Sequence, residues 1–227
     1  MLKFYFSLAP NPMKVALFLE EAWLAYEPHP VNTRKGEQHS AAFMKLNPNA
    51  KVPVLVDGDA VVFDSNAILM YLGEKTGKFM PANTPKARGE LLSWMMFVAS
   101  GVGPYAGQAV HFSRFAPEPK EYGVKRYMFE AKRHFGIVDA RLATHKFMLG
   151  DDYTIVDMAL WGWARLIPFV LGDDAMGELP NLKRLLDTIN ARPAAERTIA
   201  MKDKYTFEAV PDEEAKKHMF KHLVHAA

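Results

Sequence analysis

The spacing of apolar residues predicts alternating strands and helices in the first third of the chain. Short apolar or β-branched runs that end in turn residues predict strands, and longer stretches with apolar residues at helical spacing predict helices. In chain order, the predicted elements are strand Leu2–Phe6, helix Met13–Ala25, strand Glu27–Val31, helix Ser40–Leu46, strands Val52–Val56 and Val61–Phe63, and a helix that begins at Asp64-Ser65.

The second predicted strand is expected at the edge of a sheet. It contains Pro28 and Pro30, which have no amide hydrogen to donate to a neighbouring strand. Because a helix joins it to the first strand, the two strands should be parallel with a right-handed crossover. The whole order predicts a thioredoxin-like α/β domain, to which we assign residues 1–78.

Beyond a linker at Phe79–Thr84 the pattern is helical only. Glycine and proline at Gly101–Pro104 predict a bend in the first helix. Thr154–Asp157 has the spacing of a capping box, which we interpret as structural. We assign residues 86–227 to an all-α domain with an extra C-terminal helix at about 211–224. The predicted helices are Lys86–Phe112, Pro119–Ala143, Tyr153–Phe169, Leu179–Ala191, a short one after Pro193, and Pro211–Val224.

The stretch Lys51–Leu72 carries the strongest candidate chemistry. If the Val52–Pro53 bond is cis, the backbone of Val52 faces outward and can pair with an extended peptide. Asp64 and Ser65 place a carboxylate, a hydroxyl and free helical N–H groups at one corner. Such a corner suits the ammonium and carboxylate groups of one amino acid, so we predict a site for a small peptide. The alternative is that Asp64 and Ser65 only cap their helix.

The composition excludes several classes of function. The chain has 227 residues, 49% of them hydrophobic, so it can bury a sizeable core. Its net charge is +2, and it has no basic run typical of nucleic-acid binding. We see no apolar run near the roughly 18 residues of a membrane span and no signal peptide, so we expect a cytoplasmic protein without membrane contact. The chain has no cysteine, so thiol chemistry must use a sulfur of the ligand.

Histidines near the C-terminus do not indicate a metal site. His218, His222 and His225 show near-helical spacing, but acidic or cysteine partners in a metal-binding pattern are missing. We therefore expect no metal cofactor.

Three segments resemble the cytosolic glutathione transferases. They are NPNAKVPVLVDGDAVVFDSNAILMYLGEK (Asn47–Lys75), the linker with Pro81, and DDYTIVDMALWGW with its capping box (Asp151–Trp163). The resemblance extends from Phe4 to about Ala200. It implies an N-terminal thioredoxin-like domain, an all-α C-terminal domain, and glutathione as a substrate.

Within this family the chain is most similar to the bacterial nu class. The similarity rests on LAPNPMKVALFLEE (Leu8–Glu21), the loop Lys35–Gln38, and GVGPYAGQAVHF (Gly101–Phe112). The nu class is related to the yeast nitrogen-regulation prion protein and includes glutathione-dependent disulfide reductases. The resemblance therefore implies a homodimer that activates glutathione for attack on an electrophilic carbon or on a disulfide sulfur.

The resemblance also implies which residues hold the first two units of glutathione. Asp64 and Ser65 would bind the γ-glutamyl end, with Asp64 standing where many relatives have Glu. Val52, before a cis Pro53, would pair its backbone with the cysteinyl unit.

Further contacts are implied for the glycyl end and across the dimer. Gln38 and Lys51 would face the glycyl carboxylate, and Arg126 would reach the glutathione of the partner subunit. The alternative for Arg126 is a solvated helix face. Four residues after the predicted bend are candidates for an electrophile pocket, with core packing as the alternative: Tyr105, Gln108, His111 and Phe112.

The sequence departs from the family next to the expected position of the sulfur. Many relatives have Tyr, Ser or Cys there, and nu-class relatives have Thr at the position of Ala9; Ser7 has the wrong register. An unperturbed thiol has a pKa of about 8.5, and a helix N-terminus favours an anion. We therefore predict that the amide of Asn11 is the main stabiliser of the thiolate and the catalytic residue. The alternative is that Asn11 only caps a helix that begins at Pro12.

These observations favour a glutathione transferase that reduces disulfides with glutathione molecules alone. The rival interpretation is a non-catalytic glutathione-binding or protein-interaction module that keeps the fold, and Ala9 is the residue that favours it. Trp161 and Trp163 are interpreted as core residues.

Overall fold

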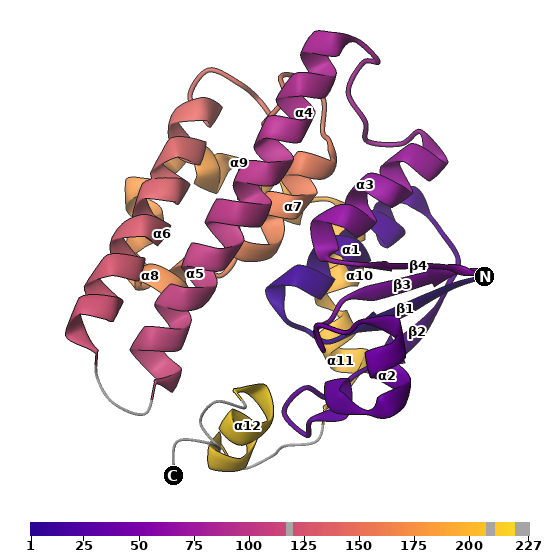
Figure 1. The fold of residues 1–227 in the computed structure, drawn as a ribbon. Coiled ribbons are helices and arrows are strands. Elements are labelled where there is room, and N and C mark those ends of the chain that lie inside the picture. Colours follow the sequence, from indigo (N-terminus) through magenta and orange to yellow (C-terminus); the bar gives the residue numbers. More distant parts are fainter. Residues whose placement is uncertain (117–119, 208–211, 221–227) are drawn as a thin grey trace.

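The computed structural model describes residues 1–116, 120–207 and 212–220. A four-stranded sheet with helices on both faces forms the N-terminal part, and helices form the rest (Figure 1). The elements of the N-terminal part are β1 Leu2–Phe6, α1 Pro10–Ala22, β2 Tyr26–Pro30, a 3-10 helix at Glu37–His39, α2 Ala41–Leu46, β3 Val54–Asp57, β4 Ala60–Phe63 and α3 Ser65–Thr76.

The sheet has the strand order β2-β1-β3-β4. β1 and β2 are parallel, with Phe4 opposite Pro28, whereas β1–β3 and β3–β4 are antiparallel. The predicted edge position of β2, its parallel pairing and the thioredoxin-like α/β order are therefore confirmed.

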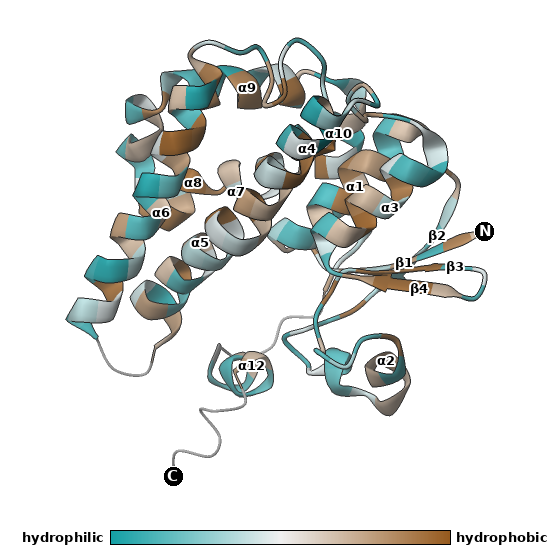
Figure 2. Ribbon diagram, turned by 45° about the horizontal axis from the view of Figure 1, so that its top comes forward, coloured by the Kyte–Doolittle hydropathy of each residue, from teal (hydrophilic) through white to brown (hydrophobic). Residues whose placement is uncertain are grey.

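Alternation along the strands gives the sheet two apolar faces. Phe4, Phe6 and Leu55 are fully buried on the face that α1 and α3 cover. Val54 on the other face packs with Phe43 of α2. Figure 2 shows the resulting apolar colour along the strands. The N-terminal ends of α1 and α3, which carry candidate residues, are thereby held against one sheet.

The C-terminal part packs its helices mainly beside α1 and α3 (Figure 1), and its Tyr205 also contacts Phe6 of β1. At Val98–Val102, where the bend was predicted, the chain forms a π-helix between α4 and α5, and a second π-helix follows at His111–Phe115. The helices are α4 Pro85–Phe97, α5 Gly103–Val110, α6 Glu121–Leu142, α7 Ile155–Ala164, α8 Ile167–Leu171, α9 Pro180–Asn190, α10 Pro193–Ile199, α11 Met201–Lys204 and α12 Asp212–Met219.

Some predicted boundaries are wrong. The single helix Tyr153–Phe169 is two helices, α7 and α8, because Pro168 cannot donate the hydrogen bond that would continue α7. Helix α1 begins at Pro10, since proline is tolerated in a first turn. The short α11 was not predicted. The last part of the predicted C-terminal helix, 221–224, lies outside the described residues.

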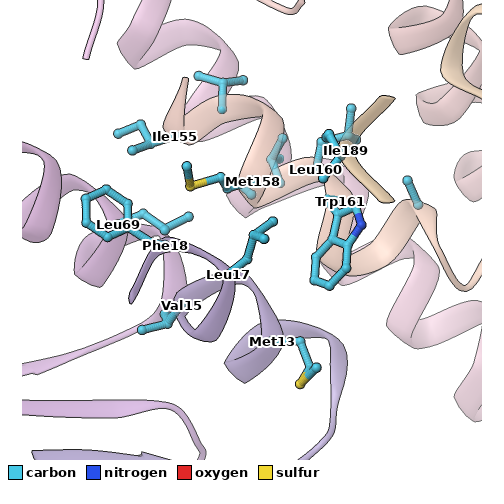
Figure 3. Close-up of a cluster of buried hydrophobic side chains, with 14 of the residues drawn as sticks. Met13, Val15, Leu17, Phe18, Leu69, Ile155, Met158, Leu160, Trp161 and Ile189 are labelled. Atoms are coloured by element: carbon cyan, nitrogen blue, oxygen red, sulfur yellow. The ribbon is translucent and has the colours of Figure 1, made fainter. Parts of the chain in front are cut away.

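The core joins the two parts along α1 and α7. Figure 3 shows Leu17 and Phe18 of α1 facing Met158 and Trp161 of α7, and all four side chains are fully buried. The indole N–H of Trp161 donates to Asn190 Oδ1 at 2.8 Å, so the prediction that Trp161 is a core residue is confirmed.

The capping box of α7 is confirmed and gives a prediction about stability. Asp157 is fully buried and accepts hydrogen bonds from the Met148 and Thr154 amides at 2.8 and 2.9 Å and from the Thr154 hydroxyl at 3.1 Å. Asp157→Ala leaves these buried donors without an acceptor, so we expect the free energy of unfolding to fall by about 3 kcal/mol. Urea denaturation measures this loss, with the exposed Asp174→Ala as control. A loss no larger than that of the control would contradict the structural role.

Candidate functional site

A cavity of about 260 Å³ lies where the first turns of α1 and α3 meet the loop before β3. A larger hollow of about 570 Å³ lies at the start of α6, but its wall is mostly apolar. We take the smaller cavity as the candidate site because polar groups from several segments converge on it. It is lined by Asn11, Asn47, Asn49, Lys51, Val52, Pro53, Phe63, Asp64 and Ser65.

The Val52–Pro53 peptide bond is cis, as predicted. The ladder of β3 begins at Val54, so Val52 lies ahead of the strand in the cavity wall. The buried Asn47 fixes this loop, because its side-chain amide donates to the carbonyl oxygen of Lys51 at 2.6 Å. The main chain at Val52 is thereby held where an extended peptide can pair with it.

Asp64 combines a structural contact with a free acceptor. Its Oδ1 accepts hydrogen bonds from the amides of Asn66 and Ala67, at 2.8 and 3.2 Å, and so caps α3. Both bonds use the same oxygen, which leaves Oδ2 for a ligand. The backbone of Asp64 has φ of 72°, a conformation that is uncommon for residues other than glycine and is often found at functional sites. Capping of α3 by Asp64 is therefore confirmed, and the second carboxylate oxygen is still able to accept a hydrogen bond from a ligand.

The orientation of Asn11 is set by Trp163. The indole N–H of Trp163 lies 3.0 Å from Asn11 Oδ1. Because an indole can only donate, the oxygen of the Asn11 amide must face it, and the amide N–H₂ group is left for the cavity. Asn11 is inside α1, whose N-cap is Ala9. The alternative that Asn11 caps a helix beginning at Pro12 is therefore wrong.

Trp163 is a candidate functional residue, because its indole N–H bonds to Asn11, and the sequence analysis did not identify it. It is half-buried and packs over α5, where a side chain at Gly103 would come within 3.2 Å of its indole nitrogen. Its assignment to the core alone was incomplete, because the ring packs against Gly103 and Gly107 of α5 while its indole N–H donates to Asn11 Oδ1. Its place two residues after the buried Trp161 was the available signal.

The loop before α1 presents no hydroxyl side chain to the cavity. Ser7 is buried, and its hydroxyl oxygen accepts a hydrogen bond from the amide of Ala9 at 3.4 Å. Ser7 is absent from the cavity wall, as its register predicted. Asn11 is thus the polar side chain that α1 contributes to that wall.

Lys14 is a second functional candidate that the sequence analysis missed. Its side chain is 1% exposed, and its ammonium donates to Ser65 Oγ at 3.4 Å. Gly162 of α7 makes room for it, since a side chain there would come within 2.5 Å of Lys14 Cγ. Burial lowers the pKa of Lys14 to about 7, and the charge of Asp64 partly opposes this shift. The signal was a lysine between apolar residues of a buried helix.

The buried lysine predicts how stability depends on pH. Between about pH 7 and 10.5 the unfolded chain binds a proton at Lys14 that the folded chain does not, so the free energy of unfolding should rise with pH in this window. Lys14→Met should remove this rise and be more stable than the wild type near pH 7. Urea denaturation across the window measures both effects. Parallel pH profiles of the two proteins would contradict the assignment.

Two predicted glutathione contacts lie away from the cavity wall. Gln38 is buried, and its side-chain amide donates to the carbonyl oxygens of Thr33 and of His218 in α12, both at 3.2 Å. Arg126 is exposed on α6, forms an ion pair with Glu130 at 2.6 Å, and lines the larger hollow. Their roles toward glutathione stay predictions.

Of the four candidates for an electrophile pocket, Phe112 lines the larger hollow, and the other three are not among the residues of its wall. Tyr105 packs on His134 with ring centroids 4.8 Å apart, and Phe112 stacks on Tyr127 at 5.1 Å, so both face α6. His111 contacts Phe220, which follows α12, at 4.6 Å. Gln108 is exposed. Their assignment to a pocket stays a prediction.

The described part of the chain forms neither a metal-binding cluster nor a membrane-spanning helix. There, no group of three His, Asp or Glu side chains is arranged to hold a metal ion. None of the described helices is both long and apolar enough to cross a membrane.

Comparison with known proteins decides the family. The family model for the glutathione S-transferase N-terminal domain matches residues 2–74, and the one for the C-terminal domain matches residues 94–193. The chain belongs to the glutathione S-transferase family. It is 37% identical over 201 residues to the disulfide-bond oxidoreductase YfcG of Escherichia coli, covering 86% of this chain and 92% of that protein. It is 36% identical to YghU of the same organism, with 86% and 73% covered.

Solved structures of this glutathione S-transferase family share the fold of the chain. A glutathione transferase from Burkholderia graminis, with two glutathione molecules bound per subunit, superposes with a TM-score of 0.82 at 35% identity, covering 90% of this chain and 89% of that one. A glutathione transferase from Pseudomonas putida, with one glutathione disulfide bound per subunit, gives 0.80 at 32%, with 87% and 90% covered. The predicted fold class and the predicted family are confirmed.

Proposed function

We propose that this glutathione S-transferase binds glutathione in the 260 Å³ cavity and activates its thiol for attack on electrophilic carbon or disulfide sulfur. The observation that carries the proposal is the meeting of the cis Val52–Pro53 bond, the free oxygen of Asp64 and the oriented amide of Asn11 around one cavity. Relatives with bound glutathione or glutathione disulfide support it.

The cavity fits an extended γ-glutamyl peptide. Asp64 Oδ2 would accept the γ-glutamyl ammonium, while the Ser65 hydroxyl and the first amides of α3 would donate to the α-carboxylate. The Val52 main chain would pair with the cysteinyl unit. The Lys51 ammonium would attract the glycyl carboxylate, and the sulfur would lie toward Asn11 and the start of α1.

Activation requires only a moderate change in thiol acidity. A free thiol with a pKa of about 8.5 is only a few per cent thiolate at neutral pH. One hydrogen bond to an ion stabilises it by about 1.5–3 kcal/mol, and each 1.4 kcal/mol lowers the pKa by about one unit. The Asn11 N–H₂ group and the dipole of α1 are therefore sufficient without a hydroxyl at Ala9.

Disulfide reduction would use two glutathione molecules because the chain has no cysteine. The first thiolate attacks one sulfur of the disulfide, its S–S bond breaks, and the departing thiolate takes a proton from solvent. The second glutathione attacks the mixed disulfide and releases glutathione disulfide and the second thiol. The two glutathione thiols supply both electrons, and the protein is unchanged.

The proposed assembly is a homodimer in which Arg126 contacts the partner's glutathione. Exposed apolar side chains on α4, α6 and β4 support an interface: Phe63, Leu92, Met96, Tyr122 and Phe129. Arg126 lies beside Tyr122 in the larger hollow. Sedimentation equilibrium tests the assembly, since a monomer at micromolar concentration would contradict it.

Turnover separates this proposal from the non-catalytic module. We expect steady-state activity with glutathione plus a haloaromatic or with glutathione plus hydroxyethyl disulfide. Mass spectrometry of the protein after turnover should find no covalent glutathione adduct. Calorimetric binding of glutathione without turnover in either assay would favour the module, and a covalent adduct would contradict the two-glutathione mechanism.

A further inference from the structure

The contact between Lys14 and Ser65 bears on how the γ-glutamyl end of glutathione binds. This inference rests on the proposed function. Lys14 reaches Ser65 from beneath the cavity, and Ser65 is itself only 2% exposed. Ser65 lines the cavity and Lys14 does not. A charge buried under a ligand-facing hydroxyl determines which way that hydroxyl can point.

The protonation state of Lys14 decides what Ser65 offers the cavity. An ammonium group has three N–H donors and no acceptor, so the Ser65 oxygen must accept from it. The hydroxyl hydrogen is then left for a carboxylate in the cavity. A neutral amine has a lone pair that can accept the Ser65 hydrogen, and the hydroxyl then no longer donates to the ligand.

We propose that Lys14 is a positioning residue for the γ-glutamyl end of glutathione, which turns the Ser65 hydroxyl toward the ligand's α-carboxylate and couples binding to protonation of its own amine. The α-carboxylate also adds a negative charge close to the buried ammonium, which favours the same protonation state. The coupling is reciprocal, so binding raises the affinity of Lys14 for its proton as much as the proton raises the affinity for the ligand.

The surroundings of Lys14 place the pKa of its amine near neutral pH. From α3 it faces the Asp64 carboxylate, which favours the ammonium, and from α7 it faces the uncharged Gly162. With burial opposing the charge, the pKa of Lys14 falls to about 7, so ligand-free protein holds both forms at neutral pH. Arg192, which precedes α10, and Arg197 within α10 face the C-terminal end of α1, where they form ion pairs with Glu21 and Glu20.

The test is calorimetric titration with S-methylglutathione, which has no thiol to ionise. Titrations in two buffers of different ionisation enthalpy give the number of protons taken up on binding. For the wild type we expect uptake to rise from near zero at about pH 6 toward one proton per site at about pH 8, and affinity to fall by up to about tenfold per pH unit above pH 7.

Lys14→Met should bind about tenfold more weakly near pH 7 and take up no proton. Ser65→Ala keeps the amine but removes the hydroxyl relay, so it should bind more weakly and take up fewer protons; it also carries the test if Lys14→Met does not fold. The exposed Lys183→Met on α9 should behave as the wild type. A loss of affinity through damaged packing alone would leave the pH profile and proton uptake of the variants as in the wild type.

The outcomes separate this inference from the proposed function. Two results would overturn the role of Lys14 and leave the glutathione site intact. In both the wild type binds tightly; in the first, Lys14→Met takes up as many protons as the wild type, and in the second, the affinity of the wild type does not change between about pH 6 and 8. Failure of the wild type to bind both S-methylglutathione and glutathione would overturn the proposed function, and this inference with it.

Discussion

Asp64→Asn is expected to weaken the binding of glutathione by roughly 10- to 100-fold. The substitution removes the negative charge that would face the γ-glutamyl ammonium, and a hydrogen bond to a charged group contributes about 1.5–3 kcal/mol. Asparagine has the same shape as aspartate, so it keeps an oxygen for the amides of Asn66 and Ala67 and fits the backbone of position 64 as aspartate does. The fold should therefore be as stable as that of the wild type.

Calorimetry with reduced glutathione measures this change, and urea denaturation confirms that stability is kept. Asp59→Asn in the exposed turn between β3 and β4 is the matched control, since it makes the same chemical change outside the cavity wall. Equal affinities for the two variants would place the γ-glutamyl group somewhere other than beside Asp64.

Asn11→Ala is expected to raise the pKa of the bound glutathione thiol by about one to two units and to lower kcat/KM near neutral pH by about 10- to 100-fold. The reason is the loss of one hydrogen bond to the thiolate, about 1.5–3 kcal/mol. Affinity for S-methylglutathione should change little, because the Asn11 amide acts on the ionised sulfur. The thiolate absorbance of the bound tripeptide, titrated against pH, measures the shift.

Trp163→Phe separates the presence of Asn11 from its orientation. Phenylalanine keeps an aromatic ring against α5 but has no N–H for Asn11 Oδ1. The amide is then free to turn, so we expect a smaller rise of the thiol pKa than in Asn11→Ala. A thiol pKa unchanged in Asn11→Ala would show that the helix dipole or backbone amides stabilise the thiolate, and Trp163 would then have no catalytic consequence.

Local sequence patterns predicted most of the fold because several local rules agreed. Pro28 and Pro30 placed β2 at an edge, and Thr154–Asp157 indicated the start of α7. The cis bond at Pro53 came from the family resemblance, not from a local rule. The break between α7 and α8 was missed although Pro168 marked it, because the apolar periodicity continues across it. Periodicity alone does not detect a lost backbone hydrogen bond.

The candidate site was predictable only where its residues are close in sequence. Asp64 and Ser65 were found because a helix start is a local feature. Trp163 and Lys14 were missed because their roles depend on partners 152 and 51 positions away, Asn11 and Ser65. The sequence analysis interpreted Trp163 as a core residue and did not single out Lys14, and only the three-dimensional contacts show which polar atoms they hold.

The titration of the thiol of glutathione bound to the wild-type protein tests the central claim most directly. With the protein in excess, so that the tripeptide is bound, the thiolate absorbance is followed against pH. Our account predicts a thiol pKa at least one unit below the value of about 8.5 for a free thiol. A bound thiol that titrates at the value of free glutathione would contradict it.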